Sequence, residues 1–148
     1  MGYGLPAAIG AQLACPGDLV VVVTGDGSLQ IGLPELGTIR EQKLPIKILL
    51  INNDCLGLVK QLQDYYCEGR HVAVHFADNP DFGGLIRAYG GNYYFAADAG
   101  ALAKALPAFL QDPQLALLEA KVSPRENVLP MVLSGKALDQ MEGLSSLL

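Results

Sequence analysis

The amino-acid sequence predicts an α/β fold in which an open parallel sheet carries helices on both faces. Short apolar runs without polar alternation recur along the chain, a pattern typical of parallel strands that are covered on both sides. Segments with helical spacing of apolar residues separate these runs. Apolar residues make up 51% of the 148 residues and charged residues 17%, so the chain can form one globular core and a disordered protein is excluded.

The first half of the chain predicts a helix followed by a βαβ unit. Residues 5–14 form the initial helix, and the apolar runs at residues 19–24 and 46–51 form two parallel strands. Helical spacing from Leu33 to Arg40 predicts a helix between these strands. Pro34 lies near its first turn, where a missing N–H costs nothing.

The second half predicts two further pairs of a helix and a strand, after a mixed segment that follows the second strand. Asn79 can cap a helix that takes Pro80 into its first turn and stops at Gly90 and Gly91. The remaining elements are a strand at residues 92–96, a helix from residue 99 to about 110 with Asp98 as its cap, and a strand at residues 115–120.

We expect residues 1–122 to form the α/β domain and residues 123–148 to form an irregular C-terminal tail. Prolines and glycines interrupt the tail, which shows no strong period. The chain begins with a glycine-rich turn that leads directly into a helix, whereas an open α/β domain usually begins with a strand. We therefore expect the domain to lack its first segment.

Charge and cysteine content exclude several classes of function. The formal net charge is -5 and basic residues do not cluster, so we expect no nucleic-acid partner and no anionic membrane surface. No stretch approaches the roughly 20 apolar residues of a membrane helix, and the N-terminus lacks the pattern of a signal peptide. Cys15, Cys55 and Cys67 form no Cys-x-x-Cys pair, which favours a reducing compartment, the cytoplasm.

Polar motifs directly follow both strands of the βαβ unit. Gly25-Asp26-Gly27 follows the first strand, and Asn52-Asn53-Asp54 follows the second. The carboxyl ends of parallel strands meet at one edge of the sheet, where ligands of open α/β folds bind. Each triplet alone is more often an ordinary turn, but the two positions together favour a ligand site.

The chemistry of these residues predicts a site for magnesium and a diphosphate. Gly25 and Gly27 allow the backbone to approach a ligand closely, and the N–H groups of Ser28 and the next residue favour an anion such as phosphate. Asp26 and Asn53 add carboxylate and amide oxygens, which Mg²⁺ takes together with phosphate oxygens.

The spacing of the two motifs resembles the signature of thiamine diphosphate enzymes, because 24 residues separate Gly25-Asp26-Gly27 from Asn52-Asn53. Nearly the whole chain is similar to the C-terminal pyrophosphate-binding domain of the acetolactate synthase large-subunit family. The similar segments are MGYGLPAAIGAQLA, GDGSLQIGLPELGTIREQKLPIKILLINND, NPDF at Asn79 and ENVLPMV at Glu126. The resemblance implies a transferase that condenses 2-keto acids such as pyruvate with loss of CO₂, in branched-chain amino acid biosynthesis.

The same resemblance assigns roles to individual residues and implies that thiamine diphosphate and Mg²⁺ are the cofactors. The residues it implies are the Mg²⁺ ligands Asp26, Asn53 and the carbonyl of Cys55, the diphosphate contacts Gly27 and Ser28, and the thiamine ring contacts Met1, Gly2 and Leu58.

The resemblance further implies a homo-oligomer, because in the family the activating glutamate comes from the pyrimidine-binding domain of a neighbouring subunit. FAD, where the family has it, is held by a middle domain and not by this segment. The resemblance leaves open whether a regulatory subunit is present. With half of the site on another domain, we expect the 148-residue chain alone to be inactive.

Two other interpretations stay open: another thiamine diphosphate carboligase or decarboxylase, and a non-catalytic α/β binding module. ENVLPMV favours acetolactate synthase. Leu62 stands where the family commonly has a tryptophan that helps favour 2-ketobutyrate, so that preference is not predicted. We assign no catalytic acid or base, because Glu35 lies near the first turn of a helix and the pair His71 and His75 lacks a third metal ligand.

Overall fold

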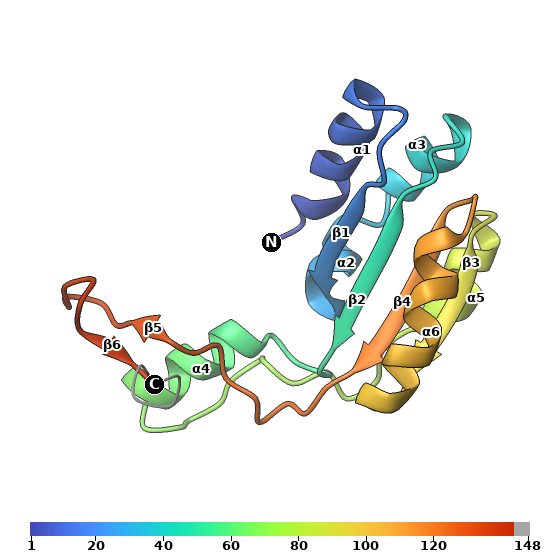
Figure 1. Cartoon of the computed structure of the whole chain (residues 1–148). Coiled ribbons are helices and arrows are strands. Elements are labelled where there is room, and N and C mark those ends of the chain that lie inside the picture. The colour runs from blue at the N-terminus through green and yellow to red at the C-terminus, as the bar shows by residue number, and fades with distance from the viewer. Residues whose placement is uncertain (144–148) are drawn as a thin grey trace.

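A parallel sheet of four strands forms the centre of the computed structural model, which describes residues 1–143 (Figure 1). The strand order is β1-β2-β4-β3, and each neighbouring pair is parallel. The expected open parallel sheet is therefore confirmed. The strands are β1 (Val21–Gly25), β2 (Lys47–Asn52), β3 (Asn92–Ala96) and β4 (Ala116–Lys121).

Helices cover the two faces of the sheet unequally. The larger core includes Ile48 and Leu117 and lies between one face and four helices. On the other face, α6 packs on β3 and β4 around the buried Phe109. This face stays exposed at Val21 and Val23 of the edge strand β1. The four helices of the larger core are α1 (Gly4–Ala14), α2 (Asp26–Ile31), α3 (Glu35–Glu41) and α5 (Phe82–Ala88), and α6 spans Ala99–Gln111.

Two helices connect β1 to β2, where the sequence predicts one. The predicted helix corresponds to α3, with Pro34 as its N-cap. The additional helix α2 begins at Asp26, directly after β1. The Gly25-Asp26-Gly27 motif therefore opens a helical turn, which fixes the backbone of Asp26 at the carboxyl end of the sheet.

Helix α5 begins later than the sequence predicts. Asp81 is its N-cap, and the Asp81 carboxylate accepts a backbone N–H of the first turn at 2.8 Å. The prediction that Asn79 caps this helix is wrong. The side-chain nitrogen of Asn79 bonds to the Asp26 and Asp54 carboxylates and its oxygen accepts from Gln30, so the Asn79 side chain is turned to the sheet edge and does not cap the helix. The predicted Asp98 cap of α6 is confirmed by its bond from the N–H of Ala101 at 2.8 Å.

An arm lies apart from the sheet and consists of α4 (Gly57–Tyr66) with the tail strands β5 (Met131–Val132) and β6 (Met141–Glu142) (Figure 1). The two strands pair antiparallel, so the described part of the tail contains a short hairpin where the sequence predicts an irregular segment. Gln61 joins α4 to the tail. Its side chain donates to the carbonyl of Val128 at 3.0 Å and accepts the N–H of Val128 at 2.8 Å.

Candidate functional site

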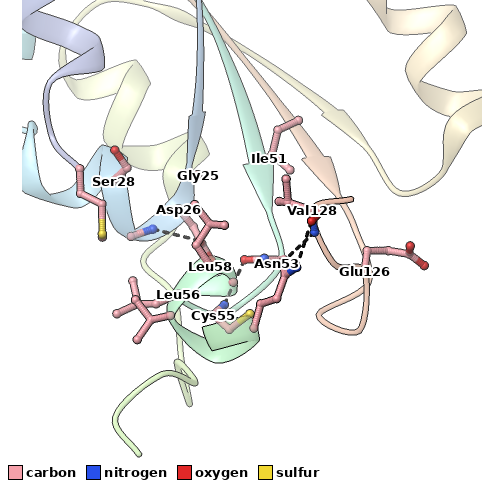
Figure 2. A pocket seen from close by; sticks show the side chains of 15 residues that line it. Gly25, Asp26, Ser28, Ile51, Asn53, Cys55, Leu56, Leu58, Glu126 and Val128 are labelled. Atoms are coloured by element: carbon pink, nitrogen blue, oxygen red, sulfur yellow. Dashed lines mark hydrogen bonds between the residues drawn. The ribbon is translucent and has the colours of Figure 1, made fainter. Parts of the chain in front are cut away.

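A pocket of about 340 Å³ lies between the carboxyl edge of the sheet and the arm (Figure 2). The ends of β1 and β2 and the start of α2 form one side. The start of α4 and the tail residues Glu126 and Val128 form the other side. The pocket therefore lies at the edge of the sheet where the sequence predicts a ligand site.

The structure brings the predicted site residues together. Gly2 alone does not line the pocket, but its N–H donates to the hydroxyl of Ser28 at 3.0 Å and so joins the start of the chain to the site. The contacts of the predicted site residues to a cofactor stay a prediction. The predicted residues that line the pocket are Met1, Gly25, Asp26, Gly27, Ser28, Asn53, Cys55 and Leu58.

The Asp26 carboxylate is buried at the base of the site, with 1% of the residue exposed. It accepts the N–H of Gly27 at 2.9 Å and the side-chain N–H of Asn79 at 2.9 Å. Burial raises the pKa of Asp26, and the nearby Asp54 carboxylate adds to this effect. Lys121 pairs with Asp54 at 2.7 Å, so among residues 1–143 no ion pair compensates the charge of Asp26. A bound cation would compensate it.

Asn53 lies in a turn that its own side chain stabilises. Its side-chain oxygen accepts the N–H of Cys55 at 3.2 Å, and Asp54 between them adopts a positive φ of 53°. A Cβ atom at Gly57 would lie 2.7 Å from the Asn53 side-chain nitrogen, so a larger residue there would displace the Asn53 amide. The backbone of Cys55 and the amide of Asn53 are therefore fixed beside the end of β2.

The two glycines of the first motif serve different purposes. A Cβ atom at Gly27 would lie 2.5 Å from a methyl carbon of Leu56 and 3.1 Å from the ring of Phe76, so this glycine allows close packing within the protein. At Gly25 a Cβ atom would meet only the carbonyl of Ile51, at 3.9 Å. Gly25 thus leaves space on the pocket side for a ligand to approach the backbone.

The donor atoms in this region fit a hard cation such as Mg²⁺. One carboxylate, one amide oxygen and a backbone carbonyl are oxygen ligands, and Mg²⁺ uses few protein ligands beside phosphate and water. No three His, Cys, Asp or Glu side chains gather into a metal-binding group within residues 1–143. The rings of His71 and His75 lie 5.4 Å apart, but His71 bonds to Asp64 and neither histidine lines the pocket.

Sequence reasoning missed three residues that shape the site: Gln61, Val128 and Asn79. Val128 belongs to the ENVLPMV segment, which only the family resemblance had marked. Gln61 gave no signal, because a glutamine in an amphipathic segment is most simply a solvent-facing residue, yet it is buried. The sequence predicts Asn79 as a helix cap, whereas its side chain bonds to Asp26. Leu62 lies on α4 outside the residues that line the pocket and is 45% exposed.

No helix within residues 1–143 is long and apolar enough to cross a membrane.

Comparison with known proteins shows which protein family the chain matches. The sequence matches the family described as "Thiamine pyrophosphate enzyme, C-terminal TPP binding domain" over residues 1–120. The acetolactate synthase large subunit of Porphyra purpurea is 41% identical over 146 residues, which are 98% of this chain and 25% of that protein. The acetolactate synthase isozyme 2 large subunit of Escherichia coli strain K12 is 39% identical over 141 residues, 95% of this chain and 26% of that protein.

The chain thus spans about a quarter of the length of these relatives. A similar solved structure is the thiamine diphosphate-dependent 4-hydroxybenzoylformate decarboxylase of Rhodococcus jostii RHA1. It superposes with a TM-score of 0.75 at 30% identity and covers 83% of this chain and 23% of that one. Sequence and fold comparisons therefore agree on the domain.

Proposed function

Because the chain belongs to the thiamine pyrophosphate enzyme family, as its C-terminal TPP-binding domain, we propose that it is the cofactor-binding part of an acetolactate synthase large subunit. The proposed domain comprises residues 1–122, followed by the tail at residues 123–148. The proposed reaction is the decarboxylating condensation of 2-keto acids such as pyruvate, a transferase step in branched-chain amino acid biosynthesis. Acetolactate synthase large subunits about 40% identical over nearly the whole chain support it.

The buried Asp26 carboxylate is the observation that carries this proposal. It lies at the pocket, and no cationic side chain of residues 1–143 forms an ion pair with it. Asn53 and the Cys55 carbonyl lie at the neighbouring strand end. These three groups would hold Mg²⁺. Gly25, Gly27 and Ser28 would hold the diphosphate.

The residues at the rim of the pocket would orient the thiamine part. Met1 and Leu58 line the pocket with largely exposed apolar side chains, and Gly2 is joined to Ser28. When bound, thiamine diphosphate supplies the thiazolium chemistry that decarboxylates 2-keto acids, while the protein binds and orients it. We assign no proton-transfer role to a residue of this chain.

The proposal includes partners that complete the site. The pyrimidine-binding domain of a neighbouring subunit would supply the activating glutamate, so the enzyme would be a homo-oligomer. FAD, if the enzyme uses it, would bind to another domain. A regulatory subunit would be a further partner. The three free cysteines fit a cytoplasmic location. Because a second domain would complete the site, the purified 148-residue chain should show no pyruvate turnover with saturating Mg²⁺ and thiamine diphosphate. Measurable acetolactate formation by this chain would contradict a shared site.

The direct test is Asp26→Ala in the full-length enzyme. We expect loss of Mg²⁺-dependent thiamine diphosphate binding, measured by isothermal titration calorimetry at saturating Mg²⁺, because the substitution removes the charged ligand. Asn53→Ala should weaken binding less, since it removes a neutral oxygen. Glu41→Ala, an exposed carboxylate on α3, is the control and should bind as the wild type does. Wild-type affinity in Asp26→Ala would contradict the assignment.

A second candidate is a thiamine diphosphate decarboxylase, which the structural likeness to the Rhodococcus decarboxylase favours. Product analysis separates the two. With pyruvate as the sole substrate, an acetolactate synthase yields acetolactate, whereas a decarboxylase yields acetaldehyde.

A further inference from the structure

The side-chain amide of Asn79 lies at the centre of the polar groups behind the candidate metal site. Its nitrogen donates to a carboxylate oxygen of Asp26 at 2.9 Å and to a carboxylate oxygen of Asp54 at 2.9 Å. The side-chain oxygen of Asn52 is a third acceptor, at 3.3 Å. Asn79 thus contacts one residue after β1 and two at the end of β2, although it lies 25 or more positions away from each of them.

The orientation of this amide is determined by its surroundings. Gln30 donates its side-chain N–H to the Asn79 oxygen at 3.1 Å. Three acceptors face the nitrogen of Asn79 and one donor faces its oxygen, so the opposite orientation would place like groups against each other. Gln30 is on α2, the helix that begins with Asp26.

The acceptors are anchored in turn to the sheet. Asn52 donates its side-chain N–H to Glu119 on β4 at 2.7 Å, and Glu119 accepts the hydroxyl of Tyr93 on β3 at 2.7 Å. Asn52 and Glu119 are both buried. A continuous chain of hydrogen bonds therefore connects Asp26 through Asn79 and Asn52 to Glu119 on β4 and Tyr93 on β3. A network of this kind is rigid when its members are satisfied.

Asn79 also lies between two carboxylates that repel each other. Lys121 binds Asp54, whereas the donors that the described residues offer to the Asp26 carboxylate, the Gly27 N–H and the Asn79 amide, are uncharged. One amide group shared by the two carboxylates holds both in place without supplying a charge that would compete with a metal ion. Helix capping does not explain the residue, because Asp81 is the cap of α5.

We propose that Asn79 is a positioning residue of the magnesium–diphosphate site, which orients the Asp26 carboxylate toward the pocket and holds it beside Asp54. Gln30 acts one step behind by orienting Asn79. This inference rests on the proposed function. Residues that orient metal ligands typically contribute about 10-fold to 100-fold to metal affinity.

The test is Asn79→Ala in the full-length enzyme, with Mg²⁺ titrated calorimetrically in the presence of saturating thiamine diphosphate. We expect the apparent Mg²⁺ affinity to fall by about 10-fold to 100-fold. Gln30→Ala should reduce it in the same direction by a smaller factor. If Asn79→Ala does not fold, the Gln30→Ala titration decides alone.

Asn92→Ala is the matched control. Asn92 donates to the Asp112 carboxylate at 2.9 Å, the same kind of bond at the opposite end of the sheet. Both variants lose an amide-to-carboxylate bond and should lower the melting temperature of the cofactor-free enzyme, but only Asn79→Ala should lower Mg²⁺ affinity. Wild-type Mg²⁺ affinity in Asn79→Ala, or in Gln30→Ala where that variant decides, overturns this inference and leaves the proposed function intact. Absence of Mg²⁺-dependent cofactor binding in the wild type overturns both.

Discussion

The pocket lies between two regions of the molecule that are held together by different interactions. The sheet side consists of strands whose apolar residues are enclosed by helices, and β2 and β4 contribute Ile48, Leu50, Leu117 and Leu118, each at most 1% exposed. Asp26 and Asn53 extend from this region. Their backbone positions are therefore set by the packing of the core.

The arm side is held mainly by polar contacts. In α4 the only buried residue is Gln61, while the apolar side chains of Leu58, Leu62 and Tyr66 are exposed. Gln61 binds the backbone of Val128, and the Tyr66 hydroxyl accepts the N–H of Ser134 at 2.7 Å. The tail and α4 form one unit through these contacts.

The sheet side of the candidate site is thus part of the core, whereas the arm side is attached to it mainly by polar contacts. Regions with few buried apolar contacts open at lower free energy than the core. We therefore expect the magnesium–diphosphate side to be preformed and the arm side to depend on cofactor or partner contacts.

The largest effect is expected for a leucine in the sheet. Leu50→Ala on β2 should destabilise the protein by about 2–5 kcal/mol, because it leaves a cavity in the core. The same substitution at Leu62 on α4, 45% exposed, should change stability by less than about 1 kcal/mol. Urea unfolding measures both. Similar losses for the two variants would show that the arm has a core of its own.

Removal of the Gln61 side chain should detach the tail from α4. Gln61→Ala removes both partners of the Val128 backbone, and because these bonds are only partly buried the loss should be about 1 kcal/mol. We expect faster hydrogen exchange at the Val128 amide, with exchange in β2 and β4 unchanged.

Gln63 provides the matched control for Gln61. Its side chain makes the same two bonds to the backbone of Val72, at 3.2 Å and 2.9 Å, but at the surface, where water can replace them. Gln63→Ala should therefore change the stability of the arm less than Gln61→Ala does. If hydrogen exchange accelerated equally at the Val128 amide in Gln61→Ala and at the Val72 amide in Gln63→Ala, partial burial of the Gln61 bonds would not explain the effect.

Acid stability should separate the two regions further. Burial would raise the pKa of Asp112, but hydrogen bonds from the Gln114 backbone, Asn92 and Tyr94 outweigh it and hold the pKa below its usual value. A carboxylate whose pKa is lowered in the folded state stabilises the protein at pH values above its pKa in the unfolded chain, which is about 4 for aspartate. This contribution is lost as the pH falls through the pKa of the folded state. Asp112→Asn should lower stability by about 1–2 kcal/mol at pH 7 and by less at pH 3.

The smallest effect is expected at Asp64 in the arm. Hydrogen bonds from Lys60 and His71 lower the pKa of Asp64, but these groups lie at the surface. Salt screens exposed ion pairs, so NMR titration at roughly 1 M salt should return the pKa of Asp64 toward its usual value. The pKa of Asp112 should move less. An equally large salt shift at Asp112 would contradict its assignment to the buried region.

The four strands of the sheet and the location of the site could be predicted from the sequence alone. Apolar runs marked the four strands, and Asp98 marked the start of α6, because periodicity and capping are local properties of the chain. The right-handed βαβ connection then brought Gly25-Asp26-Gly27 and Asn52-Asn53 to one edge, as the chirality of the backbone requires. The observed strand order and the pocket agree with this prediction.

Only the tertiary structure decided how the site is supported. Asn79 was expected to cap a helix, since its neighbourhood in the sequence contains nothing that indicates Asp26. Gln61 and Val128 are 67 residues apart, and their contact has no local signature. Such contacts depend on which side chains are brought together when helices pack on the sheet and the tail returns to α4. Long-range packing, in which hydrogen-bond partners are chosen by position in space, cannot be read from spacing along the chain.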